Sequence, residues 1–150
     1  MNIINTNNLN ESRRQIQKLK KEGMEIIVKA QDEEFNRKIL ENPDVDILLS
    51  PEMHIRKDKL KQRDSGLNEF LCKLAAKNNI KIAIDMKELQ KLEKKQKAKA
   101  LARIIQNIQL CKRTKTQIIL WPENKYKKQG IMAFIKTLKG STELGKRTGK

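Results

Sequence analysis

The chain has 150 residues, with 34 Lys and Arg against 18 Asp and Glu, which gives a formal net charge of +16. This length suits one domain with a sizeable core, and no run approaches the roughly 18 apolar residues of a membrane span. The polar N-terminus, residues 1–10, lacks the apolar stretch of a secretory signal peptide. Two cysteines are too few for a disulfide scaffold, so we expect buried free thiols and a cytoplasmic protein.

Short runs rich in Ile, Leu and Val alternate along the chain with amphipathic stretches. The runs predict five strands, at residues 3–4, 24–28, 45–49, 80–85 and 117–121. The stretch after the first strand predicts a helix that is capped by Asn8 and stopped by Gly23. A second helix begins at the acidic residues 32–34, where negative charge suits a helix N-terminus, and ends before Pro43.

The second half of the chain continues the alternation. Asp64 or Ser65 is expected to cap a third helix, which ends at residues 78–79. Residues 87–113 are helical in composition, with a break near 93–97, and a last helix is predicted at 131–138. The apolar stripe of the third helix has the spacing of a core-facing surface and comprises Leu67, Phe70, Leu71, Leu74 and Ala75.

Strands that are separated by helices of about 10 to 15 residues favour βαβ units and a parallel sheet. The predicted fold class is therefore α/β, with parallel strands that alternate with helices in one domain over residues 1–140. Residues 141–150 form a basic tail that we expect to be disordered. Periodicity does not decide between an open sheet and most of a barrel.

The positive charge is concentrated in one half of the chain. Residues 1–75 hold 14 Lys and Arg against 13 Asp and Glu, whereas residues 76–150 hold 20 against 5. A one-sided excess of this size indicates a polyanionic partner, with nucleic acid as the first candidate and an anionic membrane surface as the second. A merely solvated face is the structural alternative.

Ten of the twenty basic residues of this half lie in one helical run and in a short segment after the last strand. We predict that these side chains contact RNA phosphates: Lys87, Lys91, Lys94, Lys95, Lys97, Lys99 and Arg103, followed by Lys125, Lys127 and Lys128. Only Glu88 and Glu93 interrupt the helical run, so its face would repel itself without a polyanion. The alternative is again a solvated helix face.

A tetrapeptide before the third helix, Arg63-Asp64-Ser65-Gly66, has two compatible interpretations. It can serve as a helix cap with a glycine that permits a tight approach. It can also bind an anion or contact a partner, because a helix N-terminus presents free N–H groups and Arg63 adds a forked donor.

The scarce aromatic residues indicate packing more than base stacking. Phe35 and Phe70 fall on helical core stripes, so both are expected in the core. Trp121 and Tyr126 lie near the end of the last strand, where they can pack at the rim or stack on a base.

The chain shows little sign of its own catalytic chemistry. Asp46 and Asp85 lie in or at the end of predicted strands, where barrels build active sites, but Asp85 is equally suited to cap the next helix. The single histidine, His54, lies in a polar loop and is expected at the surface. We therefore predict no catalytic residue and no metal or cofactor bound by this chain.

Two blocks of sequence carry a family resemblance. The first joins residues 45–52 to residues 63–79, which place a strand, the Asp-Ser-Gly turn and an amphipathic helix in order, and the second spans residues 102–112. Together they resemble archaeal ribonuclease P protein component 3, the counterpart of the eukaryotic thirty-kilodalton subunit.

This resemblance implies a TIM-barrel-like fold and a role in the ribonucleoprotein that removes 5′ leaders from precursor tRNA. It implies that the RNA subunit is the catalyst, that magnesium serves this RNA, and that the protein partner is component 2 in a heterotetramer. No counterpart of the family's first strand–helix unit precedes Met1, so we expect a shortened or open barrel. The alternatives are a metal-dependent phosphoesterase on a related barrel and a general RNA-binding or ribosomal protein.

Overall fold

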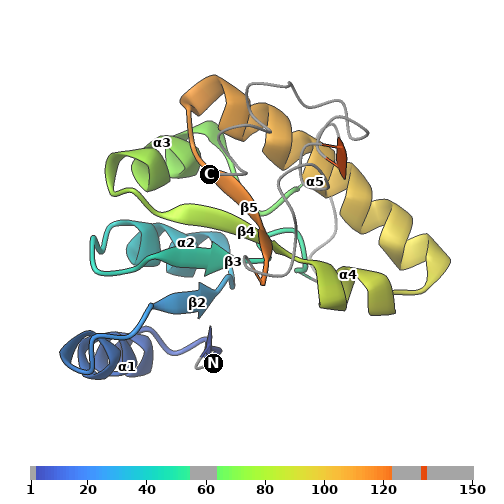
Figure 1. Ribbon diagram of the computed structural model, residues 1–150. Helices are drawn as coiled ribbons and strands as arrows, with labels where there is room; N and C mark the ends of the chain where they lie inside the picture. Colours follow the sequence, from blue (N-terminus) through green and yellow to red (C-terminus); the bar gives the residue numbers. More distant parts are fainter. Residues whose placement is uncertain (1–2, 55–63, 123–132, 135–150) are drawn as a thin grey trace.

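The short apolar runs form one parallel sheet in the computed structural model, which describes residues 3–54, 64–122 and 133–134 (Figure 1). The strands are β1 (Ile3–Ile4), β2 (Ile27–Lys29), β3 (Ile47–Leu49), β4 (Lys81–Asp85) and β5 (Ile118–Trp121). The helices are α1 (Leu9–Lys21), α2 (Glu33–Leu40), α3 (Glu69–Lys77), α4 (Met86–Lys91) and α5 (Lys94–Thr114). The predicted alternation of parallel strands and helices is confirmed.

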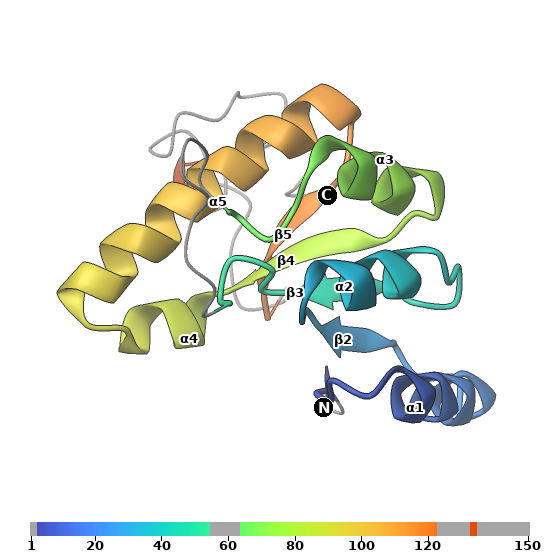
Figure 2. The same cartoon turned by 180° about the vertical axis from the view of Figure 1, so that it is seen from behind.

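Alternate residues of each strand face opposite sides of the sheet, and both sides are apolar. Val28, Leu48 and Ile82 join the main core, which they form with helix residues such as Ile16 and Ile104. Their neighbours on the other side form a second cluster of Ile27, Ile47, Leu49, Ala83 and Ile119, against which Ile3 and Trp121 pack. The helices therefore cover one face, and α2, α3 and α5 lie side by side over it (Figure 2).

The strand order is β1-β2-β3-β4-β5, so every strand pairs with its neighbour in the sequence. A doubly wound sheet reverses its order at a switch point and carries helices on both faces, whereas a βα-barrel adds strands in one direction with helices outside. The observed winding is that of a barrel. Within the described residues β1 and β5 pair with only one neighbour each, so the sheet is open.

Side-chain caps determine where the helices begin. Asn8 caps α1 by accepting from the Glu11 N–H at 3.2 Å, as predicted. Asp85 caps α4 through the N–H groups of Lys87 and Glu88. The prediction that Asp64 or Ser65 caps α3 is wrong, because Asn68 accepts from the Leu71 N–H at 2.8 Å and the helix begins one residue later.

The break expected near residues 93–97 is present and lies slightly earlier. Leu92 has extended backbone angles (φ −70°, ψ 145°), and Glu93 occupies the N-cap position of α5. This short extended link separates α4 from α5. The helix predicted at 131–138, apart from residues 133–134, and the tail at 141–150 lie outside the described residues.

Phe70 is the clearest error in the predicted core, because its side chain is 60% exposed. The buried residues of α3 are Leu71, Cys72 and Ala75. Successive helical residues are about 100° apart, so Phe70 lies on the side opposite this buried arc. Phe35 is buried as predicted, and Cys72 and Cys111 are buried free thiols.

None of the helices within the described part of the chain is long and apolar enough to cross a bilayer.

Candidate nucleic-acid interface

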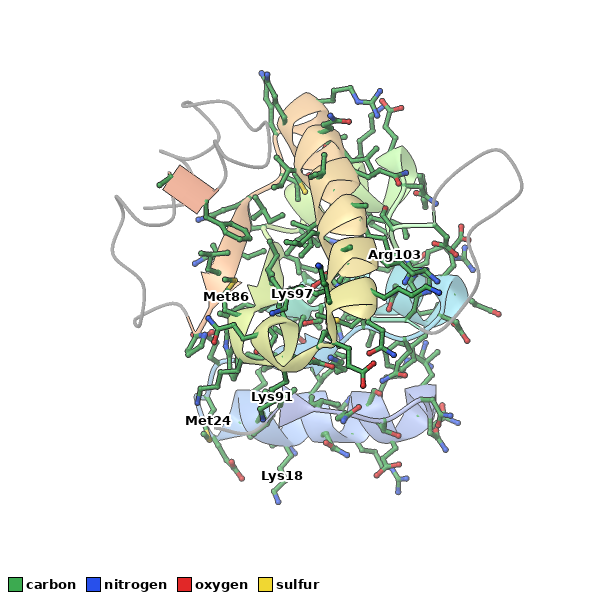
Figure 3. All side chains as sticks on the ribbon, turned by 90° about the vertical axis from the view of Figure 1, so that its right-hand side faces the viewer. Lys18, Met24, Met86, Lys91, Lys97 and Arg103 are labelled. Carbon is green, nitrogen blue, oxygen red and sulfur yellow. The ribbon has the colours of Figure 1, made fainter. Side chains whose placement is uncertain are left out.

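Most lysines of the predicted basic run are exposed on α4 and on the first turns of α5. We call this surface the α4–α5 basic face, and within the described residues it comprises Lys87, Lys91, Lys94, Lys95, Lys97 and Lys99. Lys97 is half-buried and the other five are exposed. Figure 3 views this side of the molecule, with Lys91 on α4 and Lys97 on α5 labelled.

The acids near this face do not neutralise it. Glu88 turns toward the sheet, where its Oε2 lies 2.7 Å from Lys29 Nζ at the end of β2. Glu93 is at the N-cap of α5 but makes no side-chain capping bond. The ion pairs found among the described residues include none of the six lysines. The face therefore presents an uncompensated positive surface, which suits a polyanion.

Arg103 does not share this exposed surface, although the sequence placed it in the same run. It is 3% exposed, and its Nη1 donates to the main-chain oxygens of Glu52 (3.1 Å) and His54 (2.9 Å). The guanidinium therefore fastens α5 to the loop that follows β3. Its place in the molecule is structural, unlike that of the lysines.

The Asp64-Ser65-Gly66 turn is tied into the same region. Asn107 of α5 donates to the main-chain oxygen of Ser65 at 3.1 Å, and the Gly66 N–H donates to Asp64 Oδ1 at 3.0 Å. Gly66 has φ +87°, and a Cβ at this position would lie 2.0 Å from the oxygen of Pro51. Only glycine fits here, so the turn joins the β3 loop to the start of α3.

His54 is held inside this junction and not at the surface, which corrects its prediction as a surface residue. Its side chain is 6% exposed, and Nε2 lies 2.6 Å from the main-chain oxygen of Asp64 and 3.4 Å from its carboxylate. The polar sequence around His54 concealed this, because its partner lies ten residues further along the chain.

Glu52 is a buried carboxyl group that no motif or spacing singled out as a candidate site residue. It follows β3, is 1% exposed, and neither carboxylate oxygen has a hydrogen-bond partner in the structure. Burial raises the pKa of Glu52 to about 7, against the lowering effects of its own main-chain N–H and of the charge of Lys29, while the charges of Glu88 and Asp85 raise it further. The only sequence signal was an acid three residues after the end of an apolar strand.

The two strand-associated acids that the sequence singled out, Asp46 and Asp85, do not lie together. Asp46 directly precedes β3 and accepts from the Ile26 N–H at 2.8 Å, whereas Asp85 lies at the far end of the neighbouring strand β4. No group of three or more His, Cys, Asp or Glu side chains among the described residues could hold a metal ion.

A cavity of about 340 Å³ opens beside the α4–α5 basic face, lined by Met53, His54, Leu92, Gln96 and Lys99 among others.

Several predicted contacts fall outside the described residues. They are Arg63 of the tetrapeptide, Tyr126, and the basic residues Lys125, Lys127 and Lys128. Trp121 is partly buried and packs against the second apolar cluster.

Comparison with known proteins gives a consistent result. Ribonuclease P protein component 3 of Methanococcus maripaludis is 31% identical over 117 residues, which cover 78% of this chain and 47% of the relative. The protein of the same name from Methanocaldococcus jannaschii is 27% identical over 140 residues, covering 90% of this chain and 57% of the relative. The resemblance to archaeal ribonuclease P protein component 3 is confirmed. The chain spans about half the length of these relatives.

The fold agrees with this resemblance. A chain in the cryo-EM structure of archaeal ribonuclease P with mature tRNA superposes with a TM-score of 0.75 at 23% identity, and the match covers 97% of this chain and 62% of that one. The predicted TIM-barrel-like architecture in a shortened, open form is thus confirmed, together with the consecutive strand order. No protein-family model matches the chain.

Proposed function

We propose that this chain is a protein subunit of ribonuclease P that binds the catalytic RNA and supports removal of 5′ leaders from precursor tRNA. The observation that carries the proposal is the uncompensated α4–α5 basic face on a chain that resembles component 3 over 78% of its length. The proposal assigns catalysis and its magnesium ions to the RNA, and assigns no catalytic group to this chain.

The lysines would act on the RNA backbone. Lys side chains bind phosphates as point charges and do not contact base edges. Binding would therefore depend on the shape of the RNA backbone and not on the base sequence. Neutralising phosphates releases counterions and lowers the repulsion within a folded RNA. The protein would therefore let the catalytic RNA fold and act at a lower magnesium concentration.

The proposal includes a protein partner, component 2, with which the chain would form a heterotetramer. Residues 51–68 and their neighbours are the candidate contact, because the first half of the chain is nearly neutral and can face protein without strong repulsion. The free buried thiols of Cys72 and Cys111 suit a reducing compartment, which supports a cytoplasmic location.

Co-purification tests the proposal most simply. A tagged chain is recovered from its own organism, and the bound RNA is sequenced beside that of a variant in which Lys91, Lys94, Lys95, Lys97 and Lys99 are Ala. We expect ribonuclease P RNA to be enriched with the native chain and depleted with the variant. Enrichment of ribosomal RNA instead would contradict the proposal and favour a general RNA-binding protein.

A further inference from the structure

The near-neutral first half of the chain conceals a separation of charge. Helix α1 carries five basic residues, namely Arg13, Arg14, Lys18, Lys20 and Lys21, and its one acid is Glu11 in the first turn. Glu22 ends α1 at its C-cap and Glu25 follows it, whereas the other acids of the first half lie in or beside α2, around β3 and at or before the start of α3. The net charge summed over residues 1–75 therefore averages the positive charge of α1 with the negative charge of acids elsewhere in this half of the chain.

The buried side of α1 fixes the direction of its basic side chains. Ser12, Ile16 and Leu19 are buried against the sheet, so Arg13, Arg14, Lys18, Lys20 and Lys21 are all exposed. In Figure 3 the labelled Lys18 points away from the body of the molecule. Arg14, Lys18 and Lys21 follow one another at i, i+4 and i+7, a line of about 10 Å along the helix.

The stability of the helix does not explain this arrangement. Lys18 and Lys21 lie in the last turn, where a positive charge complements the helix dipole, but Arg13 and Arg14 lie before it. The like charges of Arg14 and Lys18 at i, i+4 repel each other. Glu11 keeps its negative charge while its carboxylate accepts from Thr6 and Gln15, so it offsets only one of the five positive charges of the helix.

We propose that Arg13, Arg14, Lys18 and Lys21 form a second phosphate-binding surface for RNA, separate from the α4–α5 basic face. This inference rests on the proposed function. Lys20 is left out because its Nζ is paired with Asp44. The two surfaces flank opposite ends of the sheet, since α1 follows β1 and α5 precedes β5 (Figure 1).

The helices between the two surfaces carry no excess positive charge, because α2 and α3, counted with Asp32, have four acids against four bases, so the surfaces are two contacts and not one stripe. Asp32, Glu33, Glu34 and Glu69 are exposed at the N-termini of α2 and α3, and these two helices lie between α1 and α5. Negative side chains at this position would repel a phosphate backbone that crossed them. The chain would therefore contact two separate segments of a folded RNA, one at each end of its sheet.

Charge removal on α1 tests the proposal against a matched control. The α1 variant carries Arg14→Gln, Lys18→Gln and Lys21→Gln, and the control carries Lys38→Gln, Lys73→Gln and Lys77→Gln on α2 and α3. Both lose three positive charges, and glutamine is about as good a helix former as Lys or Arg. Urea unfolding of each variant confirms that the fold is intact. The probe is an RNA duplex of about 20 base pairs, titrated between about 50 and 200 mM salt.

The α1 variant should bind the duplex on the order of 100-fold more weakly near 0.1 M salt, with a salt slope reduced by about 2. The control should change affinity less than about threefold, because Lys73 is paired with Glu69 at 3.4 Å and because α2 and α3, counted with Asp32, carry as many acids as bases. Equal losses in the two variants would overturn the proposal, since net charge alone would then account for the effect.

Parallel measurements separate this proposal from the one on which it rests. If substitution of the α4–α5 lysines weakens RNA binding and the α1 variant binds like the native chain, the second surface is wrong and the proposed function stands. If the native chain does not bind RNA at all, both fail. If the α1 variant keeps its RNA affinity but loses a protein partner, α1 is a protein-docking surface and the proposal is overturned.

Discussion

The Arg103 guanidinium donates to the main-chain oxygen of Glu52 across 3.1 Å and so joins α5 to the loop that follows β3. This contact spans 51 residues of sequence, and both residues line the same cavity as Lys99 of the α4–α5 basic face. A buried arginine thus supports a surface formed by exposed lysines, and the two kinds of basic residue should respond differently to substitution.

Arg103→Ala should destabilise the protein by about 3 kcal/mol, because two buried carbonyl oxygens lose their donor. Lys99→Ala, one turn earlier on the same helix, should change the free energy of unfolding by less than about 0.5 kcal/mol. Urea unfolding measures both. A similar small effect for the two variants would contradict a structural role for Arg103.

Gly66→Ala should destabilise the protein by at least about 3 kcal/mol, because it combines a left-handed backbone with overpacking. The new Cβ would lie 2.0 Å from the oxygen of Pro51. Gly23→Ala is the matched control, since Gly23 has φ +68° but no atom within 4 Å of its added Cβ. The control should cost only about 1 to 2 kcal/mol. Equal losses of stability would show that backbone strain alone matters at Gly66.

Glu52 should make stability depend on pH. Burial raises its pKa from 4.5 to about 7, so between these values the folded protein binds more protons than the unfolded chain. The free energy of unfolding should therefore fall as pH rises from about 4.5 to about 7, by up to about 3 kcal/mol, and then level off.

Glu52→Gln should remove this decline, because glutamine does not ionise. The measurement is the urea midpoint of both proteins near pH 5 and near pH 8, and the comparison rests on the change with pH within each protein. A native chain and a Glu52→Gln variant with the same pH dependence would contradict an ionising Glu52 in the core.

The α4–α5 basic face should contribute several phosphate contacts. Replacing Lys91, Lys94, Lys95, Lys97 and Lys99 by Ala should weaken binding to RNAs of different sequence alike. Each lost contact should lower the salt slope by about 0.7 to 0.9. Alanine is a strong helix former, so the fold should survive. Unchanged affinity together with an unchanged slope would mean that the face is merely solvated.

The fold could be predicted largely from the sequence, because apolar runs and helix caps are local signals. Asn8 and Asp85 cap the helices that they were expected to cap. The errors arise where tertiary contacts decide. Phe70 fits the spacing of a core stripe, yet the buried arc of α3 is centred on Leu71 and Ala75, and this depends on how the helix rests against its neighbours.

Prediction of the candidate site was limited in the same way, because tertiary contacts decide which basic residues are buried. The lysines could be predicted because a run of basic residues is visible in the sequence without knowledge of the fold. Arg103 looks like one more member of the run, and only the fold reveals that the β3 loop covers it. The basic surface of α1 was missed because half-chain sums hid it, although its i, i+4, i+7 spacing was visible.

The central claim is that this chain assists a catalytic RNA and does not cleave RNA itself. The most direct measurement is leader removal from precursor tRNA at low magnesium by the ribonuclease P RNA and component 2 of the same organism, with and without this chain. We predict faster leader removal when the chain is added, and none by the chain alone. Leader removal by the chain alone, insensitive to prior RNase treatment of the preparation and abolished by Asp85→Ala, would contradict the claim.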